Sequence, residues 1–452
     1  MKFIPHTLEQ INYMKDKLGV SNIDELFKDI PDELRLKKEL DLPESLSEIE
    51  LRKKMEEYTS LNDSANKISF LGGGIYDHYI PEVVNNLSSR SEFVTAYTPY
   101  QAELSQGALQ AIYEYQTYIT RLTGLDVSNA SLYDGANSIL EACKVAVNFN
   151  KKKKIVLSSL INPQYRKVLY TGFANTDVEL VEASAADGVT NLESVRELAK
   201  DASAIVVSQV NYFGMVEDIE AFADTAHKND ALLVAQAYPI ALGILKSPGT
   251  LGSDIVVGEG QSLGLTLSFG GSTLGFFAAK KDFIRLVPGR IVGRTTDKDG
   301  NEGYVLTLQA REQHIRRARA LSNICSNQAH CALRAAIYLA AMGKTGLRTA
   351  ALSSMKNAYY FANQLDQIEG LSVVNKKGFF NEFVLKIDDN IDFEKFDESL
   401  KLKNILLGIK LLKYFKEYEN HYLVAVTETK TKDELDKVIE IVRETIGGSC
   451  EN

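Results

Sequence analysis

Polar side chains suited to chemistry are concentrated in residues 95–107, which read TAYTPYQAELSQG. This run supplies phenol, amide and carboxylate groups from Tyr97, Tyr100, Gln101 and Glu103. Phenol and amide groups can orient the carboxylate of a small substrate, and Glu103 can position a proton acceptor or a neighbouring arginine. The structural alternative is that the tyrosines are interface aromatics and that Glu103 is a charge at a helix N-terminus. The run is therefore a candidate binding surface.

A second group of such side chains lies in residues 311–328, which begin REQHIRRAR. Helical spacing predicts that Arg311 and His314 share one face of a helix, with Arg316 and Arg319 on another. A solvated helix, or one that forms ion pairs with another subunit, is the simpler interpretation. The alternative is that this helix helps to place a substrate.

Composition excludes several classes of function. The chain has 452 residues, enough for two or three domains with sizeable cores. Its formal net charge of −9 and its pI near 5.4 argue against a nucleic-acid surface. No apolar run reaches about 18 residues, so no membrane-spanning helix is expected, and residues 1–19 lack the apolar core of a secretory signal. Four cysteines without CxxC pairing indicate reduced thiols and no metal site, so a cytoplasmic protein is predicted.

Short apolar runs alternate with helical patterns in the middle of the chain. Strands are expected at residues 154–158, 177–181, 204–209, 231–235, 254–257 and 274–279, with helices at 136–149 and 238–245. This βαβ alternation implies a mostly parallel, doubly wound sheet in an α/β protein. The flanking patterns divide the chain into an N-terminal helical arm (1–66), a large domain (67–330) and a small C-terminal α/β domain (331–452).

The stretch between residues 230 and 279 resembles the centre of the large domain of fold-type-I pyridoxal-phosphate-dependent enzymes. In that family one strand ends in an aspartate that pairs with the pyridine nitrogen, the next leads to the lysine that forms the Schiff base, and a glycine-rich turn follows. Here Gln236 stands at the aspartate position and Ser262 at the lysine position, and residues 247–279 contain no lysine. A neutral amide cannot hold a pyridinium charge, and a hydroxyl cannot form an imine. The resemblance implies the scaffold without its own cofactor chemistry.

The run at 95–107, together with GGGIYDHYIP at 72–81, is similar to the P-protein family of the glycine cleavage system, glycine dehydrogenase (decarboxylating). The length and the missing lysine resemble the alpha subunit of enzymes that are split into two chains. The similarity covers essentially the whole chain, including residues 311–328. One departure is Ala102, which stands where a proline is expected.

This resemblance implies a complex, α2β2, with a lysine-bearing beta subunit that binds pyridoxal phosphate covalently. The complex would decarboxylate glycine and pass the aminomethyl group to the lipoyl arm of H-protein. This chain would line the partner's site with Tyr97, Tyr100, Gln101 and Glu103, and would place substrate or lipoyl arm with Arg311 and His314. The turn formed by Gly270, Gly271, Ser272 and Thr273 would reach the partner's cofactor phosphate with amides and hydroxyls.

Three alternatives stay open. Residues 133–138 form the corner that holds the cofactor phosphate in self-sufficient members of the fold type, and here the corner holds either a phosphate or nothing. The chain can be a self-sufficient enzyme that uses Lys246 or Lys280. It can also be a structural subunit that stabilises the beta subunit or docks the carrier without lining the pocket.

Overall fold

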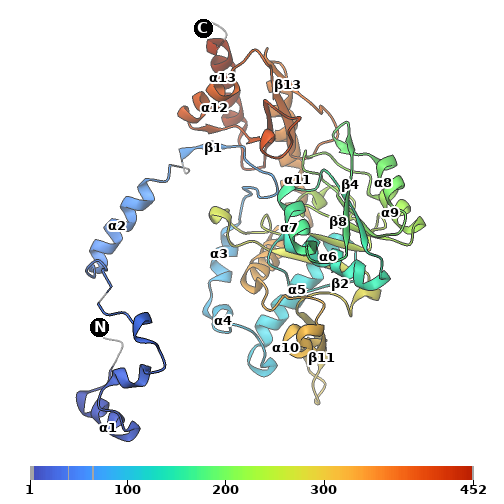
Figure 1. Ribbon diagram of the computed structural model, residues 1–452. Coiled ribbons are helices and arrows are strands. Elements are labelled where there is room, and N and C mark those ends of the chain that lie inside the picture. The colour runs from blue at the N-terminus through green and yellow to red at the C-terminus, as the bar shows by residue number, and fades with distance from the viewer. Residues whose placement is uncertain (1–4, 39, 64–65, 450–452) are drawn as a thin grey trace. The chain divides into compact units, whose positions relative to one another are not determined.

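The computed structural model describes residues 5–38, 40–63 and 66–449, and the chain divides into two compact units, Met1–Ala65 and Asn66–Asn452 (Figure 1). The first unit contains helices α1 (Leu8–Leu18) and α2 (Glu48–Ser60) and the 3-10 turns η1 (Ile23–Phe27) and η2 (Asp32–Leu34). Capping boxes at Thr7 and Ser47 begin the two helices. None of the described residues of this unit is buried.

The second unit is built around a seven-stranded sheet with the order β2-β10-β9-β8-β7-β3-β4. Its strands are β2 (Val127–Ser128), β3 (Lys154–Ser158), β4 (Glu179–Ala183), β7 (Ala202–Ser208), β8 (Leu232–Gln236), β9 (Ile255–Glu259) and β10 (Gly275–Ala279). The pairs from β4 through β9 are parallel, whereas β10 runs antiparallel to both β9 and β2. The predicted mostly parallel, doubly wound sheet is confirmed.

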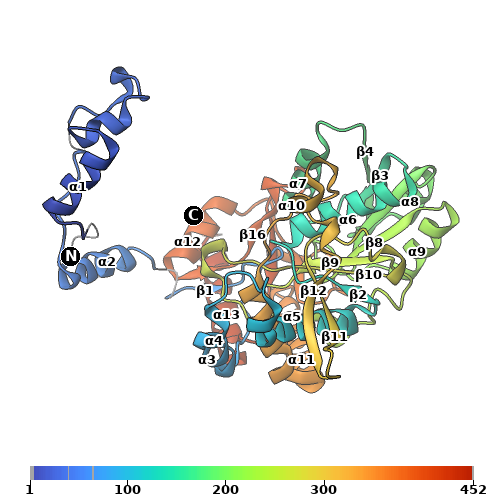
Figure 2. The ribbon, with the colours of Figure 1, turned by 90° about the horizontal axis from the view of Figure 1, so that it is seen from below.

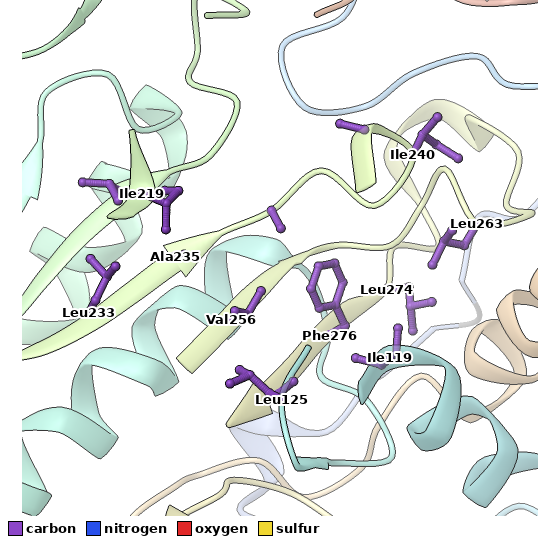
Figure 3. Packing of buried hydrophobic residues seen from close by; sticks show 14 of the residues in the cluster. Ile119, Leu125, Ile219, Leu233, Ala235, Ile240, Val256, Leu263, Leu274 and Phe276 are labelled. Atoms are coloured by element: carbon purple, nitrogen blue, oxygen red, sulfur yellow. The ribbon is translucent and has the colours of Figure 1, made fainter. Parts of the chain in front are cut away.

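Helices cover both faces of this sheet, as Figure 2 shows from below. They are α5 (Gln106–Thr123), α6 (Gly135–Asn150), α7 (Pro163–Phe173), α8 (Leu192–Leu198) and α9 (Ile219–Lys228). Alternate strand residues point to opposite faces, so Leu233 and Ala235 join one core while Leu232 and Val234 join the other. Figure 3 shows the first of these cores, in which Ile119 of α5 packs near the strands.

A second sheet, with the order β13-β14-β17-β16, lies in the C-terminal part of this unit. Its strands are β13 (Leu371–Val373), β14 (Glu382–Ile387), β16 (Ile409–Lys410) and β17 (His421–Ala425), and its helices are α12 (Phe393–Leu402) and α13 (Lys432–Ser449). The long α11 (Ala329–Leu365) contributes side chains to this core and to a core of the large sheet. The boundary at residue 330 stays a prediction.

Short elements complete the second unit. They are β1 (Ile68–Ser69) paired with β15 (Ile405–Leu406), β5 (Ala185–Ala186) paired with β6 (Val189–Thr190), the hairpin β11 (Ile291–Thr296) and β12 (Glu302–Thr307), and helices α3 (Glu82–Ser88) and α4 (Ser91–Val94). In the described part of the chain, no helix has the length and apolar character needed to cross a membrane.

Two sequence predictions about helices are wrong. The helix expected at 238–245 is only the 3-10 turn η5 (Ala241–Gly243). The helix expected from residue 311 is broken into η8 (Gln309–Arg311), α10 (Gln313–Arg316) and η9 (Arg317–Arg319). Glu312 is extended and Arg317 has a φ of 52°, and neither conformation continues an α-helix. Arg311 and His314 therefore do not share a helix face.

The glycine-rich segment at 72–76 is fixed to the second sheet by Glu382, whose side chain is buried. Glu382 Oε1 accepts the Gly73 N–H at 2.7 Å, and Oε2 accepts the Tyr76 hydroxyl at 2.6 Å. A Cβ atom added at Gly72 would lie 2.4 Å from Glu382 Oε1 and from the Ala425 side chain, so only glycine permits this approach. Burial raises the pKa of Glu382 to about 7.

We expect this carboxyl to make the protein less stable as the pH rises. Its pKa is higher in the folded chain than in the unfolded chain, so its stabilising contribution is complete below pH 4.5 and is lost as the pH rises through about 7. Glu382→Gln should reduce the fall in the free energy of unfolding between about pH 5 and about pH 8, measured by urea titration. Glu398→Gln, at an exposed position on α12, should leave the fall unchanged. A wild-type pH dependence in Glu382→Gln would contradict this.

Candidate functional site

The carboxyl edge of the parallel strands carries the two residues that replace the expected cofactor groups. The Gln236 amide oxygen, at the end of β8, accepts the Ser208 hydroxyl at 2.7 Å. Ser262 follows β9, and its buried hydroxyl makes no hydrogen bond. Open α/β sheets bind ligands at this edge. Neither side chain can supply the charge or the amine that a pyridoxal site requires.

The same edge contains a buried carboxylate at the start of α6. Glu259 Oε2 accepts the Gly135 N–H at 3.0 Å, and Oε1 accepts the N–H groups of Gln261 and Leu274 at 2.9 and 2.8 Å. The Glu259 residue is only 7% exposed, and this burial raises its pKa to about 7. A Cβ atom added at Gly135 would lie 2.6 Å from the Tyr165 hydroxyl, so no space is left beside the helix end. Glu259 therefore places a carboxylate against the first residue of α6.

The residues of this edge therefore do not fit pyridoxal phosphate. Lys280, one of the two alternative Schiff-base lysines, follows β10 and binds Asp254 at 2.5 Å, at the edge of the sheet opposite Gln236. Lys246 has an exposed side chain, and its backbone carbonyl accepts the Gln209 amide at 2.8 Å. Neither position supports the self-sufficient alternative.

A second cluster joins the run at 95–107 to the segment around residue 312. The Arg290 guanidinium donates from Nη2 to the Tyr100 hydroxyl at 3.1 Å, and its centre lies 5.3 Å from the Tyr100 ring. Its Nη1 donates to the Thr98 hydroxyl at 3.4 Å, and its Nε lies 3.9 Å from Glu312 Oε2. The Arg290 and Glu312 side chains are both more than nine-tenths buried. The buried Arg290 guanidinium therefore holds the exposed Tyr100 side chain by its hydroxyl and its ring.

Sequence reasoning missed Arg290 and Glu312. The available signal was an arginine between the turn at Pro288-Gly289 and the apolar start of β11, a position where a charge is buried only with a partner. The structure brings Tyr100, Arg290, Glu312 and His314 together, with His314 Nδ1 3.8 Å from Glu312 Oε2.

The other predicted site residues are placed differently. Tyr97 is 92% exposed, and Gln101 and Glu103 are also exposed. Arg311 is held against the backbone, because three of its five guanidinium N–H groups donate to the carbonyls of Leu308 and Gly289, each at 3.0 Å, and to that of Val287.

A pocket of about 510 Å³ opens on the run at 95–107 itself and is lined by Thr98, Tyr100 and Gln101 among others. Two further pockets open beside these segments. One, of about 250 Å³, is lined by polar groups that include Arg285, Arg311, Glu312, Arg316, Arg319 and Ser322. The other, of about 270 Å³, is mainly apolar and is lined by Phe93, Tyr97, Pro99, Ile112, His330 and Leu333 among others. Both of these further pockets have mixed linings, and the first of them adds arginines and Glu312 to apolar groups such as Leu286 and Ile324.

The predicted turn at residues 270–273 is exposed. Cβ atoms added at Gly270 or Gly271 would have no atom within 4 Å. The preceding Phe269 is 88% exposed, and Thr273 anchors the turn by donating to the Tyr133 carbonyl at 3.0 Å. The backbone of the turn at residues 270–272 is therefore exposed at the surface.

Possible metal ligands are not grouped within residues 5–38, 40–63 and 66–449: no set of three or more His, Cys, Asp or Glu side chains is arranged to hold an ion. The adjacent His330 and Cys331 have separate roles. His330 Nε2 bonds the Ser88 carbonyl at 2.9 Å, whereas Cys331 is buried.

Comparison with known proteins identifies the family. The model of the glycine cleavage system P-protein matches residues 1–442. Two proteins named probable glycine dehydrogenase (decarboxylating) subunit 1 are 47% and 44% identical, from Carboxydothermus hydrogenoformans and Desulfitobacterium hafniense. These alignments cover 98% and 97% of this chain and 99% and 98% of those relatives. The predicted function agrees with the names of these relatives.

Comparison with solved structures leads to the same family. A crystal structure of glycine decarboxylase (P-protein) in an inhibitor-bound form has a TM-score of 0.90 and 41% identity, covering 98% of this chain and all of that one. A cysteine desulfurase from Thermococcus onnurineus, 15% identical with a TM-score of 0.65 over 85% of this chain and 96% of its own, shows the fold alone. The fold-type-I α/β class predicted from the sequence is confirmed. The chain belongs to the glycine cleavage system P-protein family.

Proposed function

We propose that this chain works as subunit 1 of a two-chain glycine dehydrogenase (decarboxylating). With a lysine-bearing beta subunit, it decarboxylates glycine and passes the aminomethyl group to the lipoyl arm of H-protein. The observation that carries the proposal is a P-protein fold whose sheet edge has no lysine between residues 247 and 279. An α2β2 assembly and a cytoplasmic location belong to the same proposal.

In this proposal, exposed residues of this chain line part of the active site of the beta subunit. Pyridoxal phosphate, held covalently by the beta subunit, supplies carbanion stabilisation when bound. Arg290 donates to the Tyr100 oxygen, so the Tyr100 hydroxyl proton is free to donate to the carboxylate of glycine. Tyr97, Gln101 and Glu103 are exposed and lie close to it in the sequence. Their role is to orient the substrate and to exclude water.

Two further segments take part in the proposed shared site. The exposed turn at 270–273 can reach the partner's cofactor phosphate with its backbone amides and the Ser272 hydroxyl, whereas the Thr273 hydroxyl already donates to the Tyr133 carbonyl. His314 lies beside Glu312 near the arginine-lined pocket, where it can place the substrate or the lipoyl arm. Arg311 acts indirectly, because it holds the loop at 287–289, which immediately precedes Arg290 in the sequence.

Tyr100→Phe tests whether this chain contributes to the active site. Loss of a hydrogen bond to a charged substrate group should lower kcat/KM for glycine by about 10- to 100-fold in the reconstituted complex. Arg290→Lys should also lower kcat/KM, because a single ammonium nitrogen lacks the planar fork by which Arg290 contacts Tyr100 and Thr98 from separate nitrogens. Tyr170→Phe, on α7, is the matched control and should retain wild-type kinetics. Unchanged kcat/KM in Tyr100→Phe would instead favour a structural subunit that only docks its partners.

Gly271→Leu tests the turn. Gly271 has an extended φ of −157° and open space around a Cβ atom, so the isolated chain should keep its Tm within about 2 °C. In the complex, the new side chain should weaken retention of pyridoxal phosphate by about tenfold or more, measured by dialysis against cofactor-free buffer. Gly447→Leu, at another exposed glycine with open space, should retain the cofactor normally. Equal retention of the cofactor by the two variants would contradict the proposed contact between the turn and the partner's cofactor.

A further inference from the structure

The anion position at the start of α6 is filled from within the chain. We infer that Glu259 is a built-in substitute for a phosphate group, which closes this position to any phosphorylated cofactor. The inference deepens the proposed function, in which only the partner holds pyridoxal phosphate, and rests on it for the identity of that cofactor. In this role Glu259 completes a cofactor fold that binds no cofactor of its own.

The location offers backbone N–H donors to an anion. α6 runs from Gly135 to Asn150, and its first turn contains no acidic residue. Backbone N–H groups at a helix start, with the helix dipole, bind phosphates and other anions. The helix begins beside the carboxyl end of β9, because the Gly135 N–H bonds the last residue of that strand. Open α/β sheets place their ligands at this edge.

The contacts of Glu259 resemble those of a bound anion more than those of a helix cap. Its two oxygens accept N–H groups from three segments: the start of α6, the loop after β9 and the approach to β10. A cap residue satisfies amides of its own helix, and here Asp134 already does so by accepting the Asn137 N–H at 2.7 Å. Glu259 therefore adds a second acceptor that comes from a distant part of the chain.

The loop after β9 is also covered by the glycine-rich segment at 72–76. The Gln261 side-chain oxygen accepts the Tyr76 N–H at 3.0 Å, and its nitrogen donates to the Leu265 carbonyl at 2.8 Å. This arrangement brings the glycine-rich segment at 72–76 over the loop that carries Ser262. Tyr165 fills the remaining space beside Gly135. A phosphate group can enter only if the Glu259 side chain is removed.

The test compares the thermal stability of the isolated chain in inorganic phosphate and in chloride at equal ionic strength. Glu259→Ala should lower the Tm and should create phosphate binding, so the Tm should rise with phosphate concentration and recover part of the loss. The wild type should show no phosphate-specific rise. Glu217→Ala is the matched control: Glu217 is buried and accepts the Thr190 N–H at 2.9 Å, but its oxygens bind Thr190 and Asn211, which are not helical residues, so its loss should not be recovered.

If Glu259→Ala does not fold on expression, its refolding yield in phosphate and in chloride gives the same comparison. Phosphate should raise the yield for Glu259→Ala and leave it unchanged for Glu217→Ala. Equal behaviour of the two variants would overturn the inference. So would saturable one-to-one binding of inorganic phosphate by the wild-type chain in equilibrium dialysis. Glycine turnover by the complex is measured separately, so failure here leaves the Tyr100 result intact.

Discussion

Three backbone amides from separate parts of the chain converge on the carboxylate of Glu259. A buried carboxylate is stable only when hydrogen bonds replace the water that it has lost, and each of these amides would be unsatisfied without it. The interaction therefore fixes α6, β9 and the approach to β10 at the edge where this fold ordinarily binds a ligand. The glycine-rich segment over that edge is linked to this arrangement through Gln261, and separately to the second sheet through Glu382.

The buried edge of the sheet and the exposed surface around Tyr100 differ in what they can bind. Inside, the fold of a cofactor site is present, but its functional groups are replaced. Gln236 stands in place of the carboxylate, Ser262 in place of the amine, and Glu259 fills the space for a phosphate. Outside, the buried Arg290–Glu312 pair supports exposed aromatic and polar residues around Tyr100. A chain that has closed its own site and maintains an organised exposed surface is suited to completing the site of another subunit.

The sequence predicts the sheet well because its strands are short apolar runs bounded by glycine, proline and aspartate. The expected strand at 254–257 corresponds to β9 and that at 274–279 to β10. Local pattern failed at Arg317, where a positive φ breaks the expected helix although the residue types favour one. It also could not predict the pairing of Arg290 with Tyr100, which is 190 residues away, or of Glu259 with Gly135, which is 124 away. Such contacts depend on the topology of the sheet.

The most direct measurement is borohydride reduction of the reconstituted complex in pyridoxal phosphate, followed by mass spectrometry of both subunits. A Schiff base reduced in place leaves the cofactor attached to the lysine that formed it. The account predicts one modified lysine on the beta subunit and no specific modification of this chain, in the complex or alone. A stoichiometric adduct on a lysine of this chain, formed without the partner, would contradict it.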